Sequence, residues 1–403
     1  MTSETNHETV GKKILGLEKN VFILGLTSFF NDFSSEMVLS IFPAFFASVL
    51  KSGAASLGLV EGIADAASNF IKIYSGNLSD KIQKRKIFVV WGYSLSTLTR
   101  PFYILTGTVL GALGLRLTDR IGKGLRDAPR DAIISLSTSK DETGKSFGYH
   151  RAMDTMGGIL GPIVAYLILR SFPNGFNVVF LTAFFSGLLA IATLFWIKDI
   201  KILFKNKNES ILNGKLSRRF KSYLISVFIL ALGSLPLAIM LLKTKDIGLT
   251  LAVIPLFYMA SNIAYVLSSF ISGKIADSFG HRKIIIIGYL FLIACYIILS
   301  FSNTTIFLVI AFLVYGLFYG FTDGVQRSYA AKLTEEMDRG RAYGFLNGIN
   351  GFGVLFAGIG GGLIWEKISP NTALLFGGSL IGLGLIIFLL TQLVYKHNFS
   401  RFE

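Results

Sequence analysis

The chain is poor in charge and almost free of cysteine. Only 16% of its 403 residues are Asp, Glu, Lys or Arg, whereas a soluble domain carries about a quarter. The one cysteine, Cys295, lies in an apolar run, which excludes a disulfide framework and a cysteine metal cluster. The four histidines form no spaced ligand set, so neither a bound metal nor a cofactor is expected. No phosphate-binding loop of the Gly-x-x-x-x-Gly-Lys-Ser/Thr type occurs, which argues against ATP as the energy source.

Hydrophobic residues make up 52% of the chain, in runs of about 20 residues. Each run is long enough to cross a hydrocarbon core of about 30 Å. The first run is too long for a signal peptide and lacks a small-residue cleavage site, so we expect a helix there. The sequence predicts an all-α membrane protein with twelve transmembrane helices. We place them at 21–50, 57–79, 87–107, 109–136, 145–171, 176–197, 220–243, 248–273, 284–301, 305–331, 341–366 and 371–395.

Basic residues collect in alternate loops, which accounts for the net charge of +15 without a nucleic-acid partner. They gather before the first span, between the second and third, between the sixth and seventh, and between the eighth and ninth. The positive-inside rule therefore places both termini and the central loop in the cytoplasm. We expect a multi-pass protein of the inner membrane, acting as a monomer, with the lipid bilayer and a small-molecule substrate as its partners.

The chain contains an internal repeat with an offset of about 197 residues. Segment 76–86 matches segment 273–283, so that Asp80 corresponds to Asp277. Segment 142–148 matches segment 338–344 at nearly the same offset. Two matches at one offset indicate parallel halves related by an axis along the membrane normal. We predict a tail at 1–20, a six-helix bundle at 21–197, a linker at 198–219, a second six-helix bundle at 220–395 and a tail at 396–403.

The repeated loop has the form Gly-x-x-x-Asp-x-x-Gly-Arg-Lys and resembles the signature loop of the major facilitator superfamily. Its first copy carries Gln83 in place of the second glycine. Segments 31–37 and 119–131 resemble the first and fourth helices of a bacterial and archaeal branch of that family. The resemblance covers the whole chain. It implies two pseudo-symmetric six-helix bundles and transport by alternating access.

The fifth span carries Gly148, Gly157, Gly161 and Pro162. This pattern resembles the fifth-helix motif of proton-driven exporters in the superfamily, although Ala165 and Tyr166 replace the two glycines that continue it. The glycines are expected to let helices approach closely, and Pro162 to bend the span.

Charged residues within the spans are costly and point to function. Asp32 and Glu36 lie four residues apart and share a helical face near mid-membrane. Arg120 of the fourth span should lie level with them, and a pair between Arg120 and Glu36 is a hypothesis that exchanging the two charges would test. Glu61 and Asp65 form a second acidic pair. These five residues are the candidate sites of proton and substrate coupling. For Asp32 and Glu36 the alternative is a static ion pair with a basic residue of the fourth span.

A second set of charged residues lies near the cytoplasmic ends of the spans and is predicted to form a gate. Such contacts would hold the inner side shut and break when one half rocks against the other. For Arg130 and Asp131, at the end of the fourth span, the alternative is a simple structural clamp. The set is Asp80, Arg85, Arg126, Arg130, Asp131, Asp277, Arg282 and Arg327.

The second half is poorer in charge and richer in aromatic residues. Phe228, Phe257, Tyr258, Tyr265, Tyr315 and Tyr319 are candidates to line a pocket or simply to pack. The leading hypothesis is secondary active transport by alternating access, as proton-coupled efflux of a small molecule with H⁺ as the coupling ion. The alternatives are proton-coupled uptake or symport of an anionic solute, metal-cation export, and a non-transporting membrane sensor. No nucleophile elbow, zinc spacing or cofactor signature predicts an enzyme.

Overall fold

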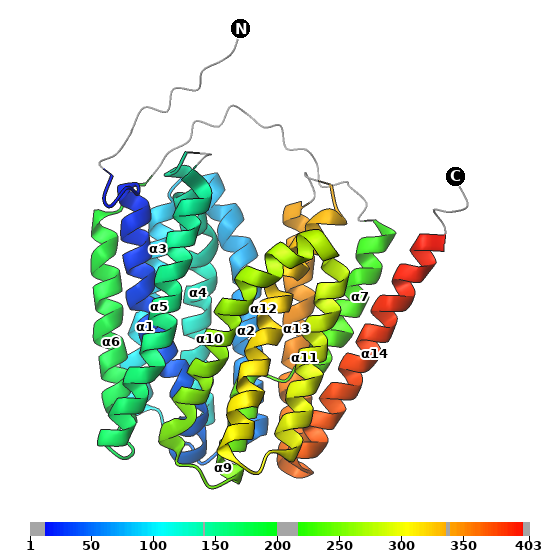
Figure 1. The fold of residues 1–403 in the computed structure, drawn as a ribbon. Helices are drawn as coiled ribbons and strands as arrows, with labels where there is room; N and C mark the ends of the chain where they lie inside the picture. Colours follow the sequence, from blue (N-terminus) through cyan, green and yellow to red (C-terminus); the bar gives the residue numbers. More distant parts are fainter. Residues whose placement is uncertain (1–12, 140–141, 200–216, 336–338, 398–403) are drawn as a thin grey trace.

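The computed structural model describes residues 13–139, 142–199, 217–335 and 339–397, and these are almost entirely helical (Figure 1). Most of the predicted linker at 198–219, and most of both tails, lie outside the described residues. The first half contains α1 (Lys19–Ser48), α2 (Ala54–Ile82), α3 (Arg85–Phe102), α4 (Val109–Leu136), α5 (Thr143–Ser171) and α6 (Phe176–Thr193). The second half contains α7 (Arg218–Gly233), α8 (Leu237–Leu241), α9 (Lys243–Asp246), η4 (Leu251–Val253), α10 (Ile254–Phe279), α11 (His281–Phe301), α12 (Thr305–Lys332), α13 (Arg339–Lys367) and α14 (Pro370–His397).

The twelve predicted spans all occur as helices in the structure, and the fold class is confirmed. Eight helical segments of the described chain are long and apolar enough to cross a membrane: α5, α6, α7 with α8, and α10 through α14. The remaining four, α1 to α4, carry most of the charged groups that concern the site. We call the face where α1 begins and α14 ends the terminal face, drawn at the top of Figure 1.

The seventh span differs from the continuous helix predicted over 220–243. Helix α7 ends at Gly233, and α8 resumes at Leu237 after Pro236. Proline has no N–H to donate and cannot continue a helical ladder. Tyr296 of α11 satisfies the broken backbone: its hydroxyl donates to the Gly233 carbonyl at 2.9 Å and accepts from the Leu235 N–H at 2.7 Å.

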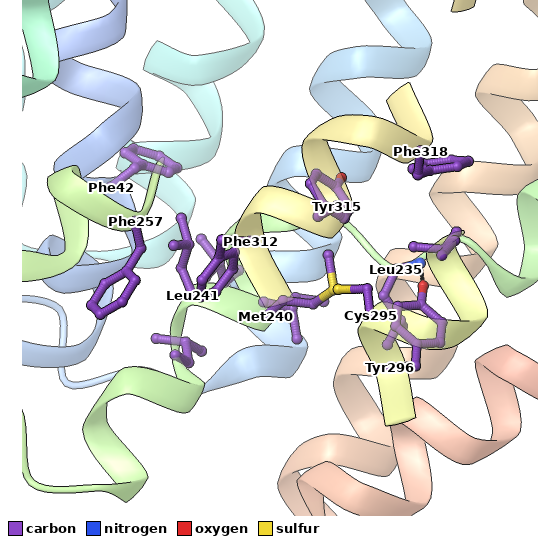
Figure 2. Close-up of a cluster of buried hydrophobic side chains, with 14 of the residues drawn as sticks. Phe42, Leu235, Met240, Leu241, Phe257, Cys295, Tyr296, Phe312, Tyr315 and Phe318 are labelled. Atoms are coloured by element: carbon purple, nitrogen blue, oxygen red, sulfur yellow. Dashed lines mark hydrogen bonds between the residues drawn. The ribbon is translucent and has the colours of Figure 1, made fainter. Parts of the chain in front are cut away.

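The short helix α8 is fixed by a hydrophobic core to which both halves contribute, including Phe42 of α1 (Figure 2). Met240 and Leu241 lie among aromatic side chains of α10 and α12, close to Cys295 of α11 (Figure 2). Burial of a large apolar side chain stabilises the fold by about 1.5–3 kcal/mol. The core therefore holds the redirected chain in place after the break.

The two halves repeat one packing scheme. In the first half α1 packs on α5 and α6, α4 on α2 and α3, and α3 on α6. In the second half α7 packs on α13 and α14, α12 on α10 and α11, and α11 on α14, which is the same arrangement one repeat later. Even single hydrogen bonds recur: Ser75 donates to the Gly124 carbonyl at 2.8 Å, and Ser272 donates to the Gly320 carbonyl at 2.6 Å.

The repeated loops also share a backbone conformation. Gln83 and Gly280 end their helices with φ values of 58° and 95°. A side chain is disfavoured at positive φ, which explains why glycine suits the second position and why Gln83 adopts its conformation at a cost.

A seam of glycines joins the halves between α2 and α13. A Cβ added to Gly358 would lie 2.4 Å from the Gly58 carbonyl oxygen, and one added to Gly362 would lie 2.5 Å from that of Ala54. The clearance grows toward the terminal face, to 3.3 Å at Gly351 and 3.9 Å at Gly348. The halves are therefore in closest contact near the opposite face and separate toward the terminal face, as Figure 1 also shows.

We expect Gly358→Ala to destabilise the protein relative to Gly360→Ala. Both changes remove the entropic cost of a helical glycine, but only Gly358 faces backbone across the seam, while a Cβ at Gly360 meets nothing within 4 Å. The overpacking cost is about 1–3 kcal/mol. Thermal unfolding of the purified protein in detergent measures the difference, and equal midpoints for the two variants would contradict the seam.

Candidate functional site

A cavity of about 390 Å³ lies between the two halves. Its volume is in the range of small-molecule sites, about 300–1,000 Å³. Helices α1, α2 and α4 supply one wall, and α8, α10 and α12 supply most of the other. The charged lining residues are Glu36, Glu61, Asp65, Arg120, Lys123 and Asp323. Five of these six come from the first half, so its charge faces the second half across the cavity.

Glu36 connects the two halves directly. The Tyr258 hydroxyl of α10 donates to the Glu36 Oε2 atom at 2.5 Å. No cation lies within ion-pair distance of Glu36 among the described residues, and the predicted Glu36–Arg120 pair is absent. Arg120 instead pairs with a carboxylate of α2.

Arg120 pairs with Asp65 of α2, with 3.1 Å between Nε and Oδ1. One turn away, Arg116 forms a bidentate pair with Glu61 at 2.8 and 2.9 Å and also donates to Asp119 at 3.1 Å. The Arg116 and Glu61 side chains are 2% and 7% exposed, whereas Asp65 is 43% exposed. The first pair is therefore a buried tie between α2 and α4, and the second is open to the cavity.

Asp32 lies on α1 one turn before Glu36, on the side of the helix that faces α5. It accepts a hydrogen bond from Asn31 at 2.9 Å, and its Cβ lies close to Gly157. Asp32 is not among the residues that line the cavity. Asp32 and Glu36 thus share a helix but face different surroundings, one within the first half and one between the halves.

Arg100 is a buried cation of the first half that the sequence analysis did not single out. It donates to Asn31 at 3.4 Å and to Thr97 at 3.2 Å. A charged residue within a predicted span is costly, and Arg100 lies within the third span. That feature of the sequence could have identified it as a candidate.

Each predicted gate residue contacts its own half in this structure. Asp80 pairs with the buried Arg85 at 2.7 Å, and Arg130 pairs with Asp131 at 2.9 Å. Arg126 donates to Ser96 at 2.9 Å and lies over the ring of Tyr93. In the second half Asp277 lies near His281, Arg282 donates to Tyr329, and Arg327 pairs with Asp323. The separation of the halves at the terminal face is consistent with this pairing.

Two of the predicted packing glycines lie against α1. A Cβ at Gly157 would lie 2.5 Å from the Phe29 carbonyl oxygen, and one at Gly161 would lie 2.5 Å from that of Phe33. Pro162 lies inside the same helix and is buried. A Cβ at Gly148 meets nothing within 4 Å, so no close helix approach occurs there among the described residues.

Tyrosines form much of the second-half wall of the cavity: Tyr258, Tyr265, Tyr315 and Tyr319 line it. Tyr265 also accepts a hydrogen bond from Arg151 of α5 at 2.5 Å, a second polar contact between the halves. The other two candidate aromatics lie elsewhere. Phe257 packs on Phe312 in the core, and Phe228 lines a groove with residues of α7 and α13.

Twelve spans in two repeated halves, with a charged cavity between them, define a multi-pass membrane transporter. The chain matches the sequence model of the Major Facilitator Superfamily over residues 24–242 and 222–402. It belongs to that family.

Three relatives of the chain are described as an MFS-type transporter, an efflux pump and a proton-coupled antiporter. An uncharacterized MFS-type transporter of Methanocaldococcus jannaschii is 34% identical, with 90% of this chain and 92% of the relative covered. A multi-drug resistance efflux pump PmrA homolog of Lactococcus lactis is 24% identical, with 97% of each chain covered. The proton-coupled antiporter flippase LtaA of Staphylococcus aureus is 22% identical, with 92% and 94% covered.

The fold is also that of solved transporter structures. A crystal structure of the nucleoside transporter NupG superposes with a TM-score of 0.77 at 18% identity, covering 93% of this chain and all of that one.

We expect Arg116→Met to destabilise the protein more than Glu61→Gln does. Removing Arg116 leaves the buried Glu61 and the partly buried Asp119 without their cation, at a cost of about 3–5 kcal/mol. Removing the Glu61 charge leaves Arg116 still paired with Asp119. Asp65→Asn serves as the comparison, because the Asp65 side chain is 43% exposed to the cavity and water there replaces part of its pair with Arg120, so we expect a smaller loss than for Arg116→Met. Unfolding midpoints in detergent test the order, and an equal loss for Arg116→Met and Asp65→Asn would contradict it.

Proposed function

We propose that this protein is a proton-coupled secondary transporter that exports a small molecule by alternating access. The observation that carries the proposal is the contact between Glu36 and Tyr258, because it places a carboxylate of one half against a phenol of the other inside the cavity. A group that takes up a proton there changes the interaction between the halves at the same time.

The physical basis is the cost of enclosing a charge. A carboxylate in a cavity that excludes water must be paired, hydrogen-bonded or protonated. Glu61 and Asp65 each have an arginine at 3.1 Å or less, whereas Glu36 has a hydroxyl. We infer that Glu36 is the carboxylate whose protonation accompanies closure. Asp32, outside the cavity lining, is proposed as a relay or supporting group of α1.

The orientation follows from the basic loops. Lys81, Lys84 and Lys86 lie at the terminal face, at the turn between α2 and α3. By the positive-inside rule we assign this face to the cytoplasm and the protein to the inner membrane. The structure then represents the state open to the cytoplasm, and the gate residues that now pair within each half would meet across the halves in the opposite state.

Export is supported by the relatives described as an efflux pump and a proton-coupled antiporter. The second candidate is symport of an anionic solute, which Arg120 and Lys123 in the cavity lining favour. The two differ in the sign of linkage, because a proton weakens solute binding in antiport and strengthens it in symport. One chain supplies both halves and the whole cavity, so we propose a monomer that carries out no bond-making chemistry.

We expect Glu36→Gln to abolish solute-dependent proton movement while solute exchange continues. Glutamine keeps the size and the contact with Tyr258 but cannot exchange a proton. The assay uses proteoliposomes with an enclosed pH dye and a screen of candidate solutes, followed by counterflow of any solute that moves protons. Glu335→Gln, an exposed carboxylate outside the cavity, is the control. Normal proton movement by Glu36→Gln would rule out this coupling site.

We expect Asp80→Asn to lower the maximal transport rate with little change in the solute concentration that gives half-maximal rate. Asp80 lies at the terminal face beside Arg85, away from the cavity lining. Its loss should alter the balance between the two open states and leave the binding groups intact. Lys81→Gln on the same turn is the matched control. A loss confined to affinity would argue against a gate role.

A further inference from the structure

The charged residues of the cavity lining can be sorted by their partners. Glu61 pairs with Arg116, Asp65 with Arg120, and Asp323 with Arg327. Glu36 accepts its hydrogen bond from Tyr258. Besides Lys123, the cavity lining has five charged residues. Four of these are carboxylates, and each carboxylate has the partner named above.

Lys123 differs from the others. It lies on α4 one turn after Arg120, is half-buried and lines the cavity. Within the described part of the chain it has no ion pair within 4.0 Å and no side-chain hydrogen bond. The carboxylate one turn further along, Asp127, is held at 3.4 Å by Lys72 and at 3.9 Å by Arg130. Lys123 is thus an ammonium group with its donors available to whatever occupies the cavity.

The second-half wall of the cavity, opposite Lys123, is aromatic where the first-half wall is charged. Tyr315 and Tyr319 pack with their ring centroids 5.3 Å apart, and Tyr265 lies 6.2 Å from Tyr319. Tyr315 is buried in this stack, so Tyr265 and Tyr319 supply the rigid aromatic area that a flat apolar body can pack against. The small polar groups of Ser261 and Asn262 lie on the same wall.

We propose that Lys123 binds an anionic group of the transported molecule, and that the substrate is a small organic anion with a flat apolar or aromatic body. The charged group meets Lys123 on the first half, and the body packs against the tyrosines of the second. A cation in the same place would lie beside Lys123 and Arg120, while Glu61, Asp65 and Asp323 are already paired with arginines and Glu36 holds the Tyr258 hydroxyl. This inference rests on the proposed transport function and names its substrate class.

The test is a binding experiment that needs no proton gradient. Three probes share one body and differ in charge: 4-hydroxybenzoate is an anion, 4-hydroxybenzyl alcohol is neutral and 4-hydroxybenzylamine is a cation. Binding is read as a rise in the unfolding midpoint of the full-length protein in detergent, since a ligand of the folded state stabilises it. The wild-type protein should be stabilised most by the anion. Lys123→Met should weaken anion binding by roughly 10- to 100-fold, the loss expected for a charge-assisted hydrogen bond.

Two further variants keep the test specific. Lys123→Arg retains the charge and should retain the preference for the anion. Lys245→Met removes an exposed lysine of α9 outside the cavity and should behave as the wild type. A wild-type preference for the alcohol or the amine, or an anion preference that survives in Lys123→Met, would overturn the proposal.

The outcome is separable from that of the proposed function. Anion binding that depends on Lys123, together with no pH-driven flux of any solute, would support the site and refute proton-coupled transport. Proton-coupled flux of a neutral or cationic solute, with no anion preference in the binding assay, would refute the substrate class alone.

Discussion

The structure depends on one constraint, which is that a charge enclosed in the membrane must have a partner. In the first half, arginines provide these partners. Arg116 and Arg120 reach from α4 to the carboxylates of α2, and Arg100 reaches from α3 to Asn31 of α1. These contacts tie the helices of the half into one body, because separating them would expose an unpaired charge to a medium of low dielectric. The half can then move as a unit.

The second half is held together mainly by apolar and aromatic packing instead of buried ion pairs. Its helices are apolar enough to span the membrane by composition alone, and their contacts are largely aromatic. Its main irregularity is the break at Pro236, where Tyr296 binds both sides of the interrupted helix. Residues 234–238 line the cavity at this break. The same repeat scheme therefore yields a charged wall on one side and an aromatic wall on the other.

Much of this could be predicted from the sequence. The span count follows from hydropathy, the two halves follow from the repeated loops, and the concentration of buried charge in the first half follows from Asp32, Glu36 and the fourth span. Arg120 was expected to face Glu36, and its carboxylate is in fact Asp65. The error has a physical reason. Depth along a helix can be read from residue number, but the choice among several carboxylates at one depth depends on how the helices are rotated and which of them lie side by side.

The sequence was sufficient to establish a membrane protein of two halves, because length, hydropathy and repetition can be read from the chain itself and each span must satisfy its own backbone in lipid. The packing of the helices was needed to show that Glu36 contacts the other half, and that Lys123 has no ion pair within 4.0 Å among the described residues. Those facts depend on distances between helices far apart in the chain. Such distances are set by packing, above all by glycine seams where backbones meet.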